Sequence, residues 1–360
     1  MKIGIIYSQQ GTNVNYRGLW AAQALGRRGH SVLLAPVGQN RAVAWERLAD
    51  CDVVHVYRLT DPPIAAAVEA LRARGVAISW DIDDDMRVVP REAPNYQLYG
   101  GLKGTRAFSF QLKMMRRAHV VTTTTETLAE RFRATGHPEV ITIDNYLDAS
   151  QFGPPAPHDG IVIGWTAAGE HRADVVRLKI TDMLREVMDR DPRVRVVTMG
   201  LRLKLDPSRY SFDPGVPLEQ LASHMRRFDV GIAPISDIPF NLCRSNVKVK
   251  EYAAASVPWL ASARGPYAGL DSRYGGITLA DDQWVPALLA LASSSEKREA
   301  LRFKGTGWAS TQRLDFHLDK WLSVWSRAAA LAGRPAQGAG PAAVPSSGKG
   351  YKVALSITKR

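Results

Sequence analysis

The stretch that decides the fold reads SNVKVKEYAAASVPWLAS, from Ser245 to Ser262. Its polar start predicts the beginning of a helix, and the apolar run around Trp259 predicts a buried strand. Lys248 and Glu251 are three residues apart, so they share one helix face near free backbone N–H groups that attract phosphate oxygens. This arrangement suits a nucleoside diphosphate, with the ammonium and amides on phosphate and the carboxylate on ribose hydroxyls. A solvated (i, i+3) pair on an ordinary amphipathic helix is the alternative interpretation.

The composition is that of a globular chain with anionic partners. Its 360 residues favour two domains, and the net charge of +12 favours a nucleotide diphosphate, an anionic membrane surface or nucleic acid. Cys51 and Cys243 are far apart in sequence, which argues against both a disulfide framework and a zinc site. No long apolar run and no signal-peptide pattern occur, so we expect a cytoplasmic protein.

Short Val- and Ile-rich runs alternate with helical patterns in the first half, which is typical of βαβ units. The predicted strands are Lys2 to Tyr7, Ser31 to Ala35, Asp52 to Tyr57, Val76 to Trp80, Val120 to Thr122 and Val140 to Ile143. The predicted helices are Tyr16 to Arg27, Ile64 to Arg74, Arg106 to Arg117 and Thr125 to Ala134.

A Pro-rich connection at 153–157 separates this series from a second one. Its predicted strands are Ile161 to Trp165, Val194 to Met199 and Asp229 to Ala233, and its helices are Ala173 to Met188, Leu218 to Arg226, Trp284 to Ala292 and Leu314 to Ala330. We therefore predict a first domain over 1–153 and a second over 160–312. Helices over 313–332 would pack back on the first domain, and the Gly-, Pro- and Ser-rich basic tail over 333–360 would be disordered.

Several phrases, taken in order, resemble the GT-B glycosyltransferases, and in particular the retaining enzymes of family 4 (group 1). The pattern K-x-x-E-Y-x-A-x-x-x-P-x-x-x-S from Lys248 resembles their donor-site helix. GTNVNYR at 11–17 with ALGRRGHSV at 24–32 resembles their first loop and helix, and VITIDNYLDASQF at 140–152 resembles the segment before their interdomain linker. IGWT at 163–166 is similar to the start of their donor domain. The resemblance covers residues 1 to about 330. It implies an α/β fold in which two Rossmann-like domains face each other across a cleft.

The resemblance also implies roles for individual residues. Lys248 would hold the donor diphosphate with help from Arg244, the amides of Ser245 and Asn246 would cap it, and Glu251 would bind ribose. His171 is a secondary donor-site candidate. His55 is more simply a core or cleft-wall histidine than a general base. One departure is notable: the family has a second Glu near the sugar hydroxyls, and this chain has Cys243 there.

The first loop does not carry a dinucleotide fingerprint. G-x-G-x-x-G is absent, and the predicted second strand ends without Asp or Glu, which disfavours a nicotinamide dehydrogenase. In GT-B enzymes this loop faces the acceptor, so Gly11 and Arg17 are acceptor-side candidates. For Arg17 an exposed surface position is an equal alternative.

The run from Asp81 to Asp85 holds four carboxylates at the end of an apolar strand. One interpretation is the metal-binding D-x-D of GT-A enzymes. We favour the other, in which Asp81 or Asp83 projects into the cleft to orient an acceptor hydroxyl while Asp84 and Asp85 cap the next segment. A solvated capping loop is the third interpretation.

The sequence therefore predicts transfer of a sugar from a nucleotide-diphosphate donor to a glycan, a lipid-linked glycan or a small molecule, with retention, no metal and no cofactor. A nucleotide-sugar epimerase and a degenerate, non-catalytic binding subunit are the alternatives. The basic helix Arg106 to Arg117, with Phe108, Leu112 and Met115, would either rest on an anionic membrane or pack on its own sheet. We expect no nucleic-acid partner, because no recognisable module appears.

Overall fold

The structure is a computed structural model that describes residues 1–9, 13–38, 43 and 45–333. Gly11 and the segment 334–360, to which the sequence analysis assigned roles, lie outside the described residues. Among the residues that are described, no helix combines the length and the apolar character needed to cross a bilayer.

The first half is built on a parallel six-stranded sheet in the order β2-β1-β3-β4-β5-β6. Its strands are β1 (Lys2–Ser8), β2 (Ser31–Val37), β3 (Val53–Tyr57), β4 (Ala77–Asp81), β5 (Val120–Thr123) and β6 (Val140–Thr142). The three central strands β3, β4 and β5 are buried along their whole length, as expected for a sheet covered on both faces. The register places Tyr57 beside Asp81 and Asp81 beside Thr122, so these polar side chains meet at the carboxyl edge.

Helices cover both faces of this sheet: α1 (Leu19–Arg27), α2 (Pro62–Ala73), α3 (Tyr96–Tyr99), α4 (Gly101–Met115) and α5 (Glu126–Arg133). Helices α2, α4 and α5 share one apolar core with the sheet, and α1 shares another. Helix α1 begins later than predicted, because Gly18 adopts a φ of 115° against His55. A Cβ at Gly18 would lie 2.9 Å from the His55 ring, so a larger residue does not fit there.

The second half repeats the design with a parallel sheet in the order β12-β11-β10-β7-β8-β9. Its strands are β7 (Ile161–Thr166), β8 (Val194–Met199), β9 (Tyr210–Asp213), β10 (Val230–Ala233), β11 (Trp259–Ser262) and β12 (Gly276–Leu279). Its helices are α6 (Arg172–Arg177), α7 (Ile180–Arg190), α8 (Leu218–Met225), α9 (Pro239–Leu242), α10 (Val247–Ala254), α11 (Trp284–Ala292) and α12 (Ser295–Thr311). The single helix predicted over Ala173 to Met188 is in fact two, because Lys179 between them has a φ of 51°.

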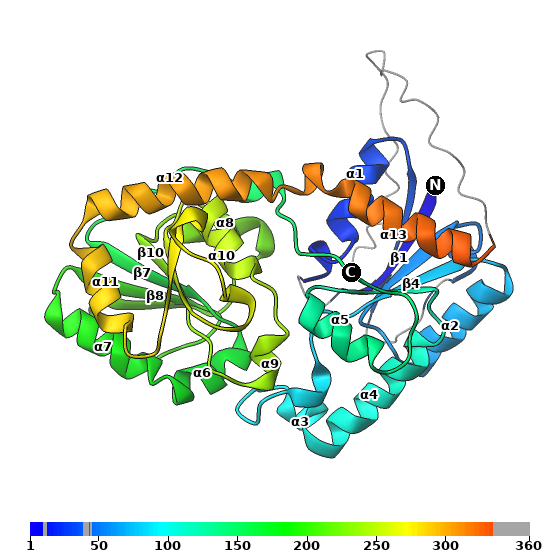
Figure 1. Ribbon diagram of the computed structural model, residues 1–360, viewed down its shortest axis with the longest axis horizontal. Coiled ribbons are helices and arrows are strands. Elements are labelled where there is room, and N and C mark those ends of the chain that lie inside the picture. Colours follow the sequence, from blue (N-terminus) through cyan, green and yellow to red (C-terminus); the bar gives the residue numbers. More distant parts are fainter. Residues whose placement is uncertain (10–12, 39–42, 44, 334–360) are drawn as a thin grey trace, which may run out of the picture.

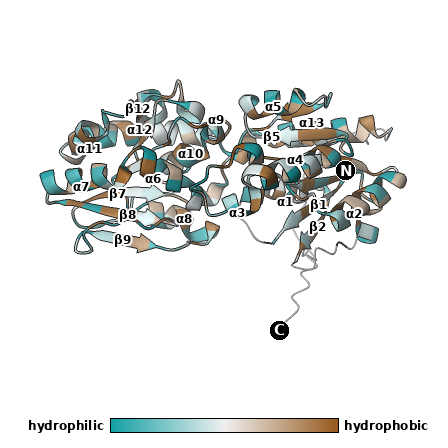
Figure 2. Cartoon of the chain, turned by 90° about the horizontal axis from the view of Figure 1, so that it is seen from below, coloured by the Kyte–Doolittle hydropathy of each residue, from teal (hydrophilic) through white to brown (hydrophobic). Residues whose placement is uncertain are grey.

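The chain crosses between the halves twice, and the two crossings touch. Leu147, just before the first crossing, forms a bridge with Arg313 in the second. After this return, α13 (Leu318–Leu331) lies on the first sheet beside α1 (Figure 1), where Trp321 and Trp325 are fully buried. The molecule thus consists of two Rossmann-like α/β units side by side, and the view from below places α3 at their junction (Figure 2).

Candidate functional site

A cavity of about 310 Å³ lies between the halves, at the carboxyl ends of both sheets. This is the place where open α/β folds bind ligands. The first half contributes Asn13, Tyr16, Asp83, Asp84, Thr124 and Asn145 to its lining. The second half contributes the cations Arg244 and Lys248, the acids Glu170 and Glu251, and a group of small and apolar residues. The lining is therefore cationic on part of one wall and acidic on the opposite wall.

Lys248 and Glu251 both line this cavity from α10, as their spacing predicts. The Lys248 ammonium donates to the backbone carbonyl of Thr166 and, at 3.1 Å, to the Thr166 hydroxyl. Burial lowers the pKa of Lys248 to about 8, an effect that nearby Glu251 opposes and Arg244 reinforces. Lys248 is therefore a cation whose present partners are neutral oxygens, and an entering phosphate would satisfy it better.

Tyr252, the residue after Glu251, fixes α10 on the sheet. Its ring packs on Gly231 of β10, where any Cβ would lie 2.7 Å from the ring. Its hydroxyl donates to the Ile232 carbonyl at 3.0 Å and accepts from the Thr166 amide at 3.0 Å. Thr166 also accepts hydrogen bonds from the Lys248 ammonium, so Tyr252 and Lys248 are both fixed on the same residue. The sequence analysis gave Tyr252 no role beyond its place in the motif.

Arg244 is held in the cavity wall by two side chains that follow β7. It donates to His171 Nε2 at 3.2 Å and pairs with Glu170 at 3.3 Å. On its other ring nitrogen, His171 lies 2.7 Å from Asp174, a contact that makes Nδ1 the protonated one. Burial, with Arg244, lowers the pKa of His171 to about 4, so this ring is neutral at pH 7 and orients Arg244. Both side chains line the cavity, and Arg244 is the charged one of the two.

Asp174 is an anchor that the sequence did not reveal. This buried carboxylate accepts from the Ser236 amide at 2.7 Å and from Asn241 at 2.8 Å, besides His171. It joins the start of α6 to the loop between β10 and α9. Ser236 and Asn241 are more than sixty residues away in sequence, so no local pattern identifies this connection.

Glu251 faces the first half as well as the cavity. Its carboxylate accepts from the Tyr16 hydroxyl, which itself accepts from Gln151 at 2.7 Å. Burial raises the pKa of Glu251, against the opposing effects of Tyr16 and Lys248. A ribose hydroxyl would bind here only by taking the place of Tyr16 or by sharing the carboxylate with it.

The residues at the start of α10 have different surroundings. Ser245 lines the cavity, and its hydroxyl accepts from Asn145 of the first half at 3.0 Å. Asn246 is the N-terminal cap of α10 but is not part of the lining, and its buried side-chain oxygen has no hydrogen-bond partner among the described residues. Their backbone amides precede the first turn of α10, which begins at Val247.

Arg17 and Asp81 do not project into the cavity. Both are 0% exposed, and they form an ion pair of 2.7 Å beneath it. Asp81 also accepts from the Thr122 hydroxyl at 2.5 Å, and Arg17 donates to the Ile143 carbonyl and, at 3.1 Å, to Asn145. The arrangement is a buried network that fixes the first loop to the carboxyl edge of the sheet. Of the two carboxylates expected to project into the cleft, Asp81 or Asp83, Asp81 does not. For Arg17 both the acceptor-side position and the surface position are wrong, because the side chain is fully buried and outside the cavity lining.

Asp83 and Asp84 lie at the cavity, and Arg58 pairs with both of them. Arg58 follows β3 with a φ of 59°, a conformation that costs a non-glycine residue energy and is concentrated at functional sites. Burial raises the pKa of Asp83, but Arg58, Arg17 and the hydrogen bond from Tyr57 together outweigh it and the net shift is downward. The pKa of Asp84 is raised by burial and by the neighbouring Asp83, although Arg58 opposes this.

Asp85 alone caps the next segment, as expected, by accepting from the Arg87 amide at 3.1 Å. The same role expected for Asp84 is wrong, because Asp84 points to the cavity. Within the described residues, no cluster of three His, Cys, Asp or Glu side chains has the geometry to hold a metal ion.

Cys243 does not line the cavity. Its side chain is buried in the apolar core of the first half, and its carbonyl accepts from Thr125, the N-cap of α5, at 3.0 Å. Burial raises the pKa of this thiol to about 11, so it stays protonated. His55 is likewise a core residue: fully buried, it contacts the Ser79 hydroxyl at 3.1 Å.

The part of the cavity along β8 and β9 is apolar, and the sequence analysis did not find it. Ala167, Met199, Val216, Leu218 and Leu221 line it, with Gly200 and Gly215 between them. Its residues come from three separate segments, namely the loop after β7, the end of β8 and the stretch from the loop after β9 into α8, which explains why no motif marks them. A flat heteroaromatic ring fits such a surface.

No protein-family profile matches the sequence, and no curated protein matches it. The fold, in contrast, is similar to solved structures. Sucrose-phosphate synthase from Thermosynechococcus elongatus is 12% identical with a TM-score of 0.64, over 91% of this chain and 98% of that one. HepE from Anabaena, solved with UDP-glucose, is 12% identical with a TM-score of 0.63, over 90% of this chain and 99% of that one.

A third similar structure is a putative UDP-N-acetylglucosamine 2-epimerase from Listeria monocytogenes. It is 12% identical with a TM-score of 0.56, over 90% of this chain and 95% of that one. All three similarities extend over nine tenths of this chain or more. The chain therefore has the GT-B fold, with two Rossmann-like domains, that these solved structures share.

Proposed function

We propose that the protein is a retaining glycosyltransferase that moves a sugar from a nucleoside diphosphate to an acceptor hydroxyl, without an obligatory metal or cofactor. One observation carries the proposal: Lys248, Arg244 and Glu251 converge on one cavity from the second half, opposite Asp83 and Asp84 of the first. Cations on one wall and carboxylates on the other are what a diphosphate leaving group and a hydroxyl acceptor require.

In this proposal the diphosphate binds at the start of α10. Lys248 and Arg244 stabilise the charge that develops as the bond from the anomeric carbon to the phosphate oxygen breaks. The acceptor oxygen bonds to the same face of the sugar, and its proton passes to the departing phosphate oxygen. The protein then supplies orientation and charge, and none of its side chains forms a covalent intermediate.

The remaining parts of the donor have matching surfaces. Glu251 binds the ribose hydroxyls after Tyr16 moves aside, and the base lies in the apolar part of the cavity near Met199 and Val216. Glu170 and Asp84 approach the same cavity from opposite walls and would bind sugar hydroxyls, since Cys243 is buried elsewhere. Asp83 and Asp84 would orient the acceptor, which we take to be a glycan, a lipid-linked glycan or a small polyol.

The test is a binding screen with nucleoside diphosphates and their sugars, read by thermal shift and calorimetry. A ligand at about 100 times its dissociation constant adds about 2.7 kcal/mol to the free energy of unfolding. Lys248→Met should weaken diphosphate binding by roughly 1.5 to 3 kcal/mol, the range for hydrogen bonds to charged groups. Lys297→Met, on an exposed lysine of α12, is the matched control. Equal affinity in the Lys248 variant and the control would remove Lys248 from the site.

Two alternatives are distinguished by products. An epimerase of the same architecture is favoured by the similarity to the Listeria protein and by the acids around the cavity. It would convert the donor to its 2-epimer without any acceptor, which proton NMR of the donor detects. A non-catalytic binding subunit would bind the donor with neither transfer, epimerisation nor hydrolysis.

A further inference from the structure

The segment from α3 to α4 presents an uncovered edge of the first half. Helix α4 runs along the lower edge in Figure 1, and α3 lies where the two halves meet, as Figure 2 also shows. We propose that this edge is an attachment surface for an anionic lipid bilayer. We define the α3–α4 outer face by Leu98 of α3 and by Leu102, Arg106, Phe110 and Lys113 of α4.

Cations predominate along this edge. Residues 96–117 contain five cations, Lys103, Arg106, Lys113, Arg116 and Arg117, and no acid. Among the described residues, only Arg117 of these five pairs with a carboxylate, that of Glu69 at 2.6 Å. The other four cations are exposed and lack a carboxylate partner there, so the edge attracts the phosphates of an anionic leaflet.

Helical spacing gathers the relevant side chains on one side. Leu102, Arg106, Phe110 and Lys113 follow one another at intervals of three or four residues and so share a face. The opposite face of α4 is covered, because Met114 and Met115 are buried in the core. Phe108 and Leu112 also pack on that core. The membrane contact expected for Phe108, Leu112 and Met115 is therefore wrong, because these residues are not available to a bilayer.

The two leucines of the α3–α4 outer face are unusually exposed, whereas Phe110 is half-buried. Leu102 is 90% exposed and Leu98 is 66% exposed, although both are large and apolar. Phe110 lies between two cations, with Arg106 at 6.0 Å and Lys113 at 5.5 Å from its ring centre. Leucine and phenylalanine set among lysine and arginine are the composition of interfacial helices, whose apolar groups enter the acyl boundary.

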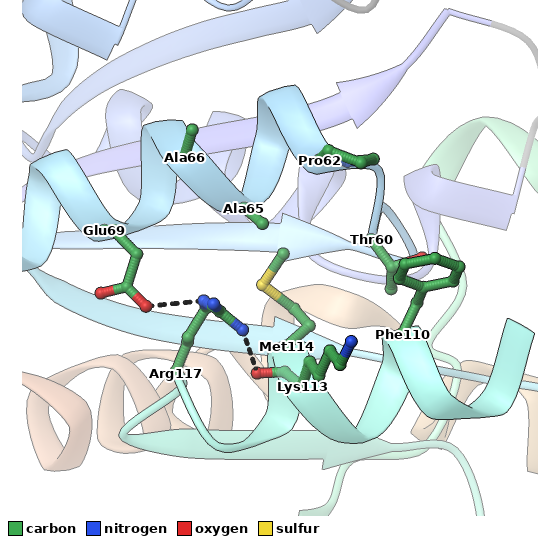
Figure 3. A pocket seen from close by; sticks show the side chains of 9 residues that line it. All are labelled: Thr60, Pro62, Ala65, Ala66, Glu69, Phe110, Lys113, Met114 and Arg117. Atoms are coloured by element: carbon green, nitrogen blue, oxygen red, sulfur yellow. Dashed lines mark hydrogen bonds and ion pairs between the residues drawn. The ribbon is translucent and has the colours of Figure 1, made fainter. Parts of the chain in front are cut away.

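A shallow groove of about 290 Å³ between α2 and α4 continues this face (Figure 3). Ala65, Pro62 and Met114 give its lining an apolar part, and Phe110 and Lys113 of the α3–α4 outer face line it as well. The carboxylate of Glu69 also lines the groove, where it pairs with Arg117. A cation beside an apolar trough suits an amphiphile with an anionic head. Nucleic acid would use the cations but would leave Leu98 and Leu102 in water, so a bilayer explains more of the surface.

The test is cosedimentation of the 360-residue chain with vesicles, either of phosphatidylcholine alone or of phosphatidylcholine with phosphatidylglycerol. We expect binding to the anionic vesicles and little to the neutral ones. Arg106→Glu with Lys113→Glu should lower the partition coefficient roughly thirtyfold or more, since each cation near an anionic surface contributes about 1 kcal/mol. Leu98→Ser with Leu102→Ser should lower it roughly tenfold.

The controls lie on α12, along the opposite edge in Figure 1. Phe303 is 84% exposed and matches Leu102, and Lys297 and Lys304 match the two α4 cations. Phe303→Ser, and Lys297→Glu with Lys304→Glu, should leave vesicle binding unchanged, and melting curves confirm that all variants are folded. Binding is measured without donor or acceptor, so its outcome is separate from that of the proposed transfer.

Three results would overturn the proposal. The first is no binding of the unaltered chain to anionic vesicles. The second is an equal loss in the α4 and α12 charge variants, which would show attraction by net charge alone. The third is binding that falls with the charge variant, is unaffected by the leucine variant and is displaced by duplex DNA, which would identify a polyanion site.

Discussion

The Lys248 ammonium is partly removed from water in the cavity wall, and its pKa of about 8 follows mainly from that burial. A group with this pKa is charged below pH 8 and loses its charge as the pH rises through that value. The pKa of His171, about 4, lies far below, so this ring does not titrate in the same range. At the residue scale, the pH dependence of donor binding above neutrality therefore reports on Lys248.

We predict that diphosphate affinity is highest at and below pH 7 and falls above pH 8, by up to about tenfold per pH unit. Bound phosphate favours the ammonium, so the midpoint in the complex lies higher than in the free protein. Titration calorimetry at pH values on either side of 8 measures the profile. Lys248→Arg should flatten it, because a guanidinium stays charged. The same profile in Lys248→Arg would assign the titration to another group.

A second residue-scale prediction separates Asp81 from Asp84. Asp81→Ala leaves the fully buried Arg17 without its partner, so we expect a loss of about 3 to 5 kcal/mol in the free energy of unfolding. Asp84→Asn changes a side chain that is 21% exposed and should alter stability by less than about 1 kcal/mol while slowing transfer about a hundredfold. Urea unfolding and initial rates measure the two effects. A stable Asp81→Ala protein would contradict the structural role.

The acidic run shows what sequence reveals about single residues. Its position after an apolar strand correctly places it at the carboxyl edge of the sheet, and two of its four carboxylates do reach the cavity. Arg17 and Arg58 belong to other segments of the chain, and each pairs with particular carboxylates of the run. These pairs decide which two carboxylates line the cavity. The selection of these two carboxylates depends on tertiary contacts. The sequence therefore identifies the loop, and only the structure identifies which of its residues line the cavity.

At the scale of elements, α10 illustrates how an anchor sets a functional side chain. The motif predicts where the helix begins, but its height above the sheet is set by Tyr252 against Gly231 and by the shared partner Thr166. A shift of α10 would move Lys248 and Glu251 together, because both are on its cavity face.

We predict that Tyr252→Phe weakens diphosphate binding several-fold, and that it destabilises the fold by about 1 to 3 kcal/mol through the unpaired Thr166 amide and Ile232 carbonyl. Tyr210→Phe is the matched control, since its hydroxyl also bonds a backbone amide, that of Leu203 at 2.8 Å, away from the cavity. The control should lose similar stability and keep its affinity. Equal affinity losses in both variants would make the effect a general one.

The elements that the sequence analysis missed share a physical reason. Helix α12 buries only Leu301, Gly305 and Ala309, so it has almost no apolar stripe to detect. It packs through Gly305, which lies against the backbone of Gly275. Strands β9 and β12 have four residues each and lie at the two edges of their sheet, so they lack the full burial that marks a central strand. Central strands and amphipathic helices were predicted well, because the spacing of their apolar residues in the sequence shows which side of the element is buried.

At the scale of the molecule, α10 joins the halves as well as lining the cavity. Lys248 faces the cavity, whereas Lys250 is 1% exposed, pairs with Asp144 of the first half and donates to the Asn145 carbonyl at 3.1 Å. Tyr16 on Glu251 and Asn145 on Ser245 are further contacts across the same junction. The described conformation is thus closed, and the residues that close it neighbour those that would bind the donor.

We predict that Asp144→Asn opens the molecule. The variant leaves the Lys250 ammonium buried with a weaker acceptor, and separation of the halves returns it to water. Small-angle scattering should show a larger radius of gyration without ligand. If only the closed state binds the donor, the apparent affinity equals the affinity of the closed state multiplied by the fraction of molecules that are closed. Saturating donor should then restore the compact form. Asp281→Asn, which breaks the 2.7 Å pair with Arg264 inside the second half, should change neither quantity. An unchanged radius and affinity in Asp144→Asn would mean that apolar contacts, such as those of Met86 and Val89 with Phe240, hold the halves together without the ion pair.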